Sequence, residues 1–157
     1  MAILIIDSCE ASRHQAVTIG KWTDGRQKLE QADTAAKALD FAIRDEPQLI
    51  VIDPSMTDSD GQSLYVKLHR VAPEAVFLAY TNDRTIPLDT FDGALGKPPS
   101  KIEFLRYYQL SKKRRIERSQ DKMSQHHATY KEKADNGERM PILVRLRSEP
   151  ELQFSIP

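Results

Sequence analysis

The chain has one cysteine, no net charge and no long apolar run, and each of these shortages excludes a class of protein. Because Cys9 is the only cysteine, an internal disulfide and a zinc site built from cysteine ligands are both excluded. No apolar run is long enough to span a membrane. The strand-length run from Met1 to Ile6 has no basic region before it and is a poor signal peptide. We therefore expect a cytoplasmic protein.

The charges are balanced over the 157 residues but unevenly placed along them. Residues 1–97 hold 10 Lys and Arg against 15 Asp and Glu, whereas residues 98–157 hold 13 against 8. The length suits one domain with an appendage. The sequence therefore predicts an acidic domain followed by a basic tail.

The most informative stretch runs from Leu49 to Gly61. Four apolar residues, Leu49 to Ile52, lead directly into Asp53 and then into a turn-rich loop. Such a run is typical of a strand buried on both faces of a parallel sheet. Asp53 would then lie at the carboxyl end of the strand, where open α/β sheets bind their ligands. The alternative is that Asp53 only starts the turn before Pro54.

Four further strands and four helices are expected around this stretch. The strands are 2–6, ending at Asp7; 27–31, a polar edge strand; 75–80, ending at Thr81; and 94–96, ending at Lys97. The helices begin at Ser8 or Cys9, at Asp33 or Thr34, near Leu64, and after Ser100, the last with Ile102, Leu105 and Tyr108 on one face. Residues 82–93 contain Pro87 and show no helical stripe.

Alternating strands and helices predict a parallel sheet with all the carboxyl ends at one edge. Four polar residues, Asp7, Asp53, Thr81 and Lys97, are each expected at such an end. Two carboxylates suit a cation such as Mg²⁺, and a hydroxyl and an ammonium suit the oxygens of a phosphoryl group. A carboxylate beside Mg²⁺ can also act as a nucleophile and form an aspartyl phosphate.

These residues and their order resemble the receiver domain of two-component response regulators over about residues 2–110. The resemblance is carried by Ile-Ile-Asp7, by Ile-Asp53 with Met56 and Asp60-Gly61 after it, by Thr81, and by Lys97-Pro98. It implies an α/β fold, a doubly wound five-stranded parallel sheet of order 2-1-3-4-5.

The resemblance also implies roles for the individual residues. Asp53 would be the phosphoacceptor, receiving the phosphoryl group from a histidine kinase or a phosphotransfer protein. Asp7, Asp53 and the Ser55 carbonyl would hold Mg²⁺. Thr81 would hydrogen-bond the phosphoryl group, and Lys97 would pair with it. The family is a signalling module and not an enzyme.

The chain departs from the family pattern at three places. Ser8 stands where the family has a second acid, so Mg²⁺ should bind more weakly, unless Glu10 compensates. The segment from Thr81 to Lys97 is short, which predicts a shortened or irregular fourth helix. Ala94 stands where the family has its switch aromatic; Phe91 and Tyr80 are candidates to replace it, although a core position suits them better.

The residues after the receiver-like part divide into two segments. Residues 111–140 are a polar helical extension or linker with a basic cluster at Lys112–Arg115 and Arg118. A heptad of Ile102, Ile116, Met123 and Tyr130, with Gln109 between them, leaves a coiled coil and hence a homodimer open as an alternative. Residues 141–157 read as two short strands, either a hairpin or a segment that pairs with a partner.

Two functional hypotheses remain. The first is a receiver that is phosphorylated on Asp53 and signals to a downstream protein partner. The second is a pseudo-receiver that works without phosphorylation as a scaffold or dimerisation module, which Ser8 and Ala94 favour. A phosphatase would need a general acid where Ser55 stands, and no helix-turn-helix pattern supports a DNA-binding regulator, so nucleic acid is not an expected partner.

Overall fold

The computed structural model describes residues 2–22, 27–83, 85 and 90–135. The chain divides into two units, residues 1–115 and 116–157. The proposed hairpin at 141–157 lies outside the described residues. No helix in the described part of the chain is both long and apolar enough to cross a membrane.

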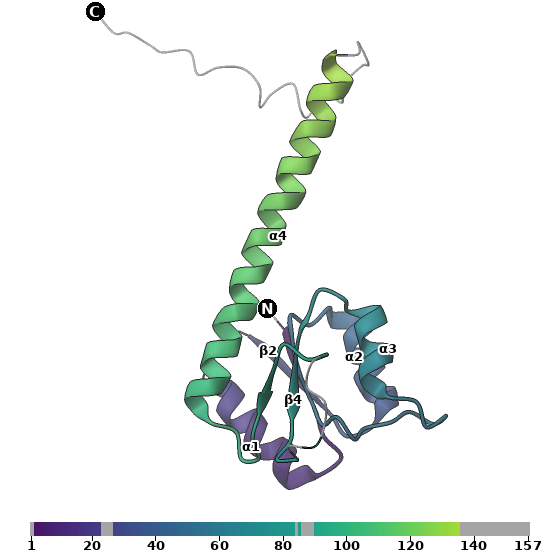
Figure 1. Cartoon of the computed structure of the whole chain (residues 1–157), viewed down its shortest axis with the longest axis vertical. Helices are drawn as coiled ribbons and strands as arrows, with labels where there is room; N and C mark the ends of the chain where they lie inside the picture. The colour runs from purple at the N-terminus through teal and green to yellow at the C-terminus, as the bar shows by residue number, and fades with distance from the viewer. Residues whose placement is uncertain (1, 23–26, 84, 86–89, 136–157) are drawn as a thin grey trace, which may run out of the picture. The chain divides into compact units, whose positions relative to one another are not determined.

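The first unit is a five-stranded parallel sheet in the order β2-β1-β3-β4-β5, which confirms the predicted doubly wound fold (Figure 1). The strands are β1 (Ala2–Ile6), β2 (Lys28–Ala32), β3 (Leu49–Ile52), β4 (Val76–Tyr80) and β5 (Gly93–Leu95). The helices are α1 (Glu10–Lys21), α2 (Ala35–Asp45), α3 (Leu64–Val71) and α4 (Lys101–Asp135), and α4 continues into the second unit.

The position of each strand in the sheet follows from its side chains. Both β1 and β3 are apolar throughout and fully buried, as central strands with helices on both faces must be. By contrast β2, with the sequence Lys-Leu-Glu-Gln-Ala, is only partly buried and lies at an edge, as its polar content predicts.

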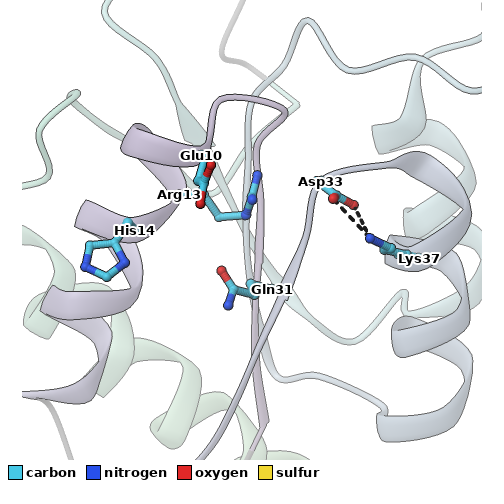
Figure 2. Close-up of a pocket in the computed structure, with 6 residues that line it drawn as sticks. All are labelled: Glu10, Arg13, His14, Gln31, Asp33 and Lys37. Atoms are coloured by element: carbon cyan, nitrogen blue, oxygen red, sulfur yellow. Dashed lines mark hydrogen bonds and ion pairs between the residues drawn. The ribbon is translucent and has the colours of Figure 1, made fainter.

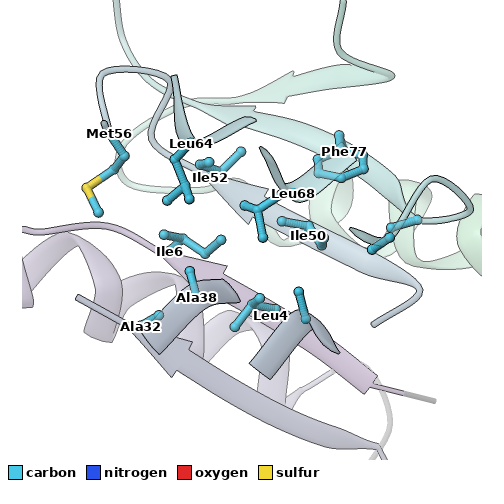
Figure 3. Packing of buried hydrophobic residues seen from close by; sticks show 13 residues of the cluster. Leu4, Ile6, Ala32, Ala38, Ile50, Ile52, Met56, Leu64, Leu68 and Phe77 are labelled. Carbon is cyan, nitrogen blue, oxygen red and sulfur yellow. The ribbon is translucent and has the colours of Figure 1, made fainter. Parts of the chain in front are cut away.

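Successive residues of the strands face opposite sides of the sheet, which produces two cores. One core joins Ile6, Ile52 and Phe77 to α2 and α3 (Figure 3). On the other face, Ile5 and Val51 pack against α1 and the first turns of α4. This arrangement buries the sheet and leaves its carboxyl edge for the loops that follow each strand.

The structure differs from the prediction in the face of α4 that packs against the sheet. Ser100 accepts a hydrogen bond from the Glu103 N–H (3.4 Å), so the expected cap is present. Ile102, however, is 82% exposed, and the residues that face the sheet are Phe104 and Tyr108, which are 0% and 1% exposed. The expectation that Ile102 shares the face of Tyr108 is wrong, because the helix turns positions 104 and 108 toward β1 and β3 instead.

The segment between β4 and β5 contains no helix among its described residues, which are 81–83, 85 and 90–92. Phe91 from this segment packs against the Tyr65 ring of α3, with centroids 4.6 Å apart. The Tyr65 hydroxyl donates to the Thr90 carbonyl at 2.6 Å. Phe91 thus lies against the core, in agreement with the position expected for it.

In the second unit, α4 continues to Asp135. Ile116 and Met123, two members of the heptad, are 59% and 68% exposed. The coiled coil and the homodimer therefore stay predictions.

Candidate functional site

The candidate site is built at the carboxyl edge of the sheet by two residues that directly follow β1 and β3 and by a third from the loop after β5. Since Ile6 pairs with Ile52 in parallel register, the residues after them, Asp7 and Asp53, emerge side by side. The Asp53 N–H donates to the Ile6 carbonyl at 2.9 Å, which extends this pairing by one residue. Lys97 reaches the same edge from the loop after β5.

The Lys97 ammonium lies between the two carboxylates and bonds to both. Its Nζ is 2.7 Å from Asp7 Oδ2 and 2.5 Å from Asp53 Oδ2. The Asp7 side chain is 1% exposed, whereas the side chains of Asp53 and Lys97 are 18% and 20% exposed. Asp7 is therefore a buried anion that depends on its cation, and Asp53 remains accessible from solvent.

The second oxygen of each carboxylate is held by the backbone that follows it. Asp53 Oδ1 accepts from the Ser55 N–H at 2.8 Å and from the Ser55 hydroxyl at 2.6 Å. Asp7 Oδ1 accepts from the Cys9 N–H at 2.8 Å. Burial acts to raise the pKa of Asp53, but the hydrogen bonds from Lys97 and Ser55 outweigh it and hold this pKa below its usual range. Asp53 is therefore ionised at neutral pH, as a nucleophile must be.

The ammonium is supported from one side by an aromatic ring. Lys97 Nζ lies 4.9 Å from the centroid of the Tyr80 ring, at cation–π distance. Burial acts to lower the pKa of Lys97, but its bonds to Asp53 and Asp7 outweigh it and raise this pKa. Tyr80 is fully buried and its hydroxyl donates to the Ser12 carbonyl at 3.0 Å. Burial raises the pKa of Tyr80 to about 12, so this hydroxyl keeps its proton.

Thr81 follows β4 at the same edge and is partly buried. Its Oγ1 accepts a hydrogen bond from the Asp83 N–H at 3.0 Å, which leaves the hydroxyl proton for another acceptor. Its N–H donates to the Leu95 carbonyl at 2.9 Å, so β5 fixes the backbone of Thr81.

The positions that depart from the family pattern add no charge to the site. Ser8 is exposed, and Ala94 pairs with Ala79 in the sheet. Within the described residues no cluster of three or more acidic, histidine or cysteine side chains is placed to hold a metal. Glu10 therefore does not complete such a cluster with Asp7 and Asp53.

Glu10 instead lines an open polar pocket of about 290 Å³ between α1 and α2 (Figure 2). The other residues that line it are Arg13, His14, Gln31, Asp33 and Lys37. Lys37 is paired with Asp33 at 2.8 Å. Arg13 donates to the backbone carbonyl of Asp7 at 2.7 Å and so braces the loop that presents this carboxylate.

Two residues near the site carried no signal in the sequence. Arg13 is an ordinary basic residue in a helix, and Asn82 is a polar residue in a loop; both act through backbone groups that only the folded chain brings near them. Only the position of Asn82, directly after Thr81, could have indicated that it lies near the site.

Comparison with known proteins places the fold. No protein-family model and no curated protein matches the sequence. Among solved structures, a two-component transcriptional regulator AraC from Clostridium phytofermentans is 18% identical, with a TM-score of 0.63, and the match covers 77% of this chain and 98% of that one. A CheY-like response regulator receiver domain protein from Methanospirillum hungatei is 21% identical, with a TM-score of 0.60 and coverage of 74% and 97%. A response regulator receiver modulated diguanylate cyclase from Pelobacter carbinolicus is 19% identical, with a TM-score of 0.60 and coverage of 76% and 97%.

These matches span nearly the whole of each known chain and about three quarters of this one. At this level of identity the matches establish only the fold. The chemistry of the site must be inferred from its own residues. The chain has the fold of response regulator receiver domains.

Proposed function

We propose that this chain is a signalling receiver in which Asp53 accepts a phosphoryl group from a histidine kinase or a phosphotransfer protein. The observation that carries the proposal is the Lys97 ammonium, which bonds to both Asp7 and Asp53 at the carboxyl edge of the sheet. An ionised, accessible carboxylate beside a fixed cation is suited to attack a phosphorus atom and to remain bound to it.

In the proposed step a carboxylate oxygen of Asp53 forms a bond to phosphorus, and the bond between phosphorus and the donor atom breaks. The leaving group takes the electron pair of that bond. Lys97 stays beside the transferred group and balances the charge on its oxygens. The Thr81 hydroxyl, whose oxygen accepts from the Asp83 N–H, donates its proton toward a phosphoryl oxygen.

We propose that a magnesium ion binds at this edge, where the carboxylates of Asp7 and Asp53 supply the oxygen ligands that it prefers. Asp7, Asp53 and the Ser55 carbonyl would hold it, because Mg²⁺ in phosphoryl-transfer sites takes one or two carboxylates and fills its remaining positions with water and phosphate oxygens. When bound, the ion would offset negative charge on the phosphoryl oxygens. With only two carboxylates and with Lys97 already paired to both, we expect weak binding.

Adding a third carboxylate should strengthen this binding. We expect Ser8→Asp to tighten Mg²⁺ binding by roughly tenfold, because it adds one negative charge beside Asp7. A calorimetric titration of wild type and variant measures the change, with Ser59→Asp, on the exposed loop after β3, as the control. An equal gain in both variants would mean that Ser8 does not face the metal.

Phosphorylation itself is tested by mass. After incubation with Mg²⁺ and acetyl phosphate, the intact wild-type chain should gain one phosphoryl group, and Asp53→Asn should gain none. Asp58→Asn is a matched control, because Asp58 lies in the same loop and is paired with Lys67 instead of Lys97. Equal phosphorylation of wild type and Asp53→Asn would remove Asp53 from its proposed role.

The second candidate is a pseudo-receiver that acts without phosphorylation as a scaffold or dimerisation module. Two observations favour it: the neutral, exposed Ser8 and the small Ala94 in β5. It predicts no added mass in either protein while the fold stays intact. In both cases we propose that residues 111–157 pass the signal to a downstream protein partner.

A further inference from the structure

Asn82, the residue after Thr81, bonds through its side chain to both backbone groups of Lys97. The pairing of β4 with β5 ends at Tyr80 and Leu95, and the Thr81 N–H adds one more bond to the Leu95 carbonyl. Beyond this point, the Asn82 side chain supplies the next hydrogen bonds between the two segments. Its Nδ2 donates to the Lys97 carbonyl at 2.6 Å, and its Oδ1 accepts from the Lys97 N–H at 2.7 Å.

These two bonds satisfy both backbone groups of Lys97. They matter because Lys97 lies outside β5 and is followed by Pro98, which has no N–H to offer. The approach is close: a Cβ added at Gly96 would lie 3.3 Å from Asn82 Oδ1. A small residue at position 96 therefore lets the Asn82 amide reach the loop.

The position of the Lys97 backbone decides where its side chain ends. The ammonium must reach Asp7 Oδ2 and Asp53 Oδ2 at once, at 2.7 and 2.5 Å, from a flexible four-carbon stem. A loop that is free to shift would favour one carboxylate over the other. The Asn82 amide fixes the backbone of Lys97, and the Tyr80 ring contacts the ammonium at the end of the side chain.

We propose that Asn82 is a positioning residue for phosphoryl transfer, which fixes the backbone of Lys97 so that its ammonium serves Asp7 and Asp53 together. The proposal rests on the proposed function for the reaction that it assists. Asn82 acts through Lys97 and is not itself catalytic.

The test compares Asn82→Ala with Asn82→Asp, which keeps an acceptor for the Lys97 N–H but lacks the donor to the Lys97 carbonyl, and with Thr85→Ala as control. Thr85 lies in the same loop as Asn82, and its hydroxyl donates to Asp83 Oδ1 at 2.6 Å and not to Lys97. Two quantities are measured: amide hydrogen exchange at Lys97 by NMR, without any phosphodonor, and the rate of phosphorylation by acetyl phosphate with Mg²⁺.

In Asn82→Ala we expect exchange at the Lys97 amide to rise about tenfold and the phosphorylation rate to fall about tenfold, since small misplacements of a catalytic group have effects of this order or larger. Exchange at Leu95, inside β5, should stay unchanged. Asn82→Asp should recover only part of the slow exchange at Lys97, because one carboxylate oxygen can accept from the Lys97 N–H but the other cannot donate to the Lys97 carbonyl. Thr85→Ala should match wild type in both measurements.

Two results would overturn the proposal. Unchanged exchange at Lys97 in Asn82→Ala would mean that the amide does not hold this loop. Faster exchange with a wild-type phosphorylation rate would mean that holding the loop does not serve the reaction. A wild-type chain that takes no phosphoryl group overturns the proposed function instead, and the exchange measurement still decides whether Asn82 fixes Lys97.

Discussion

Lys97→Ala is expected to abolish phosphorylation of Asp53 and to lower the free energy of unfolding at pH 7 by about 3 kcal/mol. The loss of stability arises because Asp7 is 1% exposed, and removing Lys97 leaves this buried carboxylate without its counter-ion, with only the Cys9 N–H, among the described residues, bonded to it. The loss of phosphorylation arises because no other described cation bonds to Asp53. Urea denaturation measures the first effect and intact mass the second.

The stability difference between wild type and Lys97→Ala should decrease at both acidic and alkaline pH. The folded-state pKa of Asp53 is lowered, so its share of the stability is present above the ordinary aspartate pKa of 3.8 and is lost as pH falls through the lower folded value. The folded-state pKa of Lys97 is raised, so its share is present below 10.5 and is lost as pH rises through the higher folded value. The difference should therefore be largest between these limits.

Lys101→Ala is a suitable control for this experiment. Lys101 is exposed, and its ammonium lies over the ring of Trp22, 4.7 Å from the centroid, away from the carboxylates. We expect this variant to keep wild-type stability within about 0.5 kcal/mol. If Lys97→Ala were as stable as Lys101→Ala at pH 7, the ion pair would not hold the site together.

The second large effect concerns the docking of α4 on the sheet. Phe104→Ala should destabilise the first unit by about 4 kcal/mol, because it removes a fully buried ring and leaves a cavity beside Ile5. Ile102→Ala, two residues earlier on the same helix, should change the stability by less than about 0.5 kcal/mol, because Ile102 is 82% exposed.

Urea denaturation of the two α4 variants shows which face of the helix packs against the sheet. A large loss for Phe104→Ala with none for Ile102→Ala is the expected pair of results. The reverse pair would mean that the stripe through Ile102 packs on the sheet, as the sequence first predicted, and would contradict the structure of this helix.

The strands and the site were predictable because both depend on local pattern and parallel topology. Apolar runs marked β1, β3 and β4, and the polar content of β2 marked it as an edge. Once the strands are parallel, the residues after them must meet at one edge. Asp7, Asp53 and Lys97 do meet there, within bonding distance.

The face of α4 was not predictable in the same way. The sets 102, 105, 108 and 104, 108, 111 both recur at helical spacing, and Tyr108 belongs to both. The choice between them is made by the sheet and α1, because Phe104 packs in the same core as Ile5 of β1 and Val17 of α1. Residue types along one helix do not contain that information.

Asn82 was missed for a related reason. Its role depends on a loop 15 residues later in the sequence, and an asparagine after a strand is equally common in an ordinary turn. The bridging of two carboxylates by one ammonium likewise requires three separate loops to be placed together. Such contacts between loops follow from the tertiary structure alone.

The measurement that tests the central claim most directly is chemical identification of the phosphorylated residue. The chain is treated with acetyl phosphate and Mg²⁺, the acyl phosphate is reduced with borohydride, and peptides are sequenced by mass spectrometry. The reduction converts a phosphorylated aspartate into homoserine, which marks its position permanently. We predict homoserine at position 53 and unmodified aspartate at positions 7, 58 and 60. Homoserine at another position, or at none while the chain remains folded, would contradict the assignment of Asp53 as the phosphoacceptor.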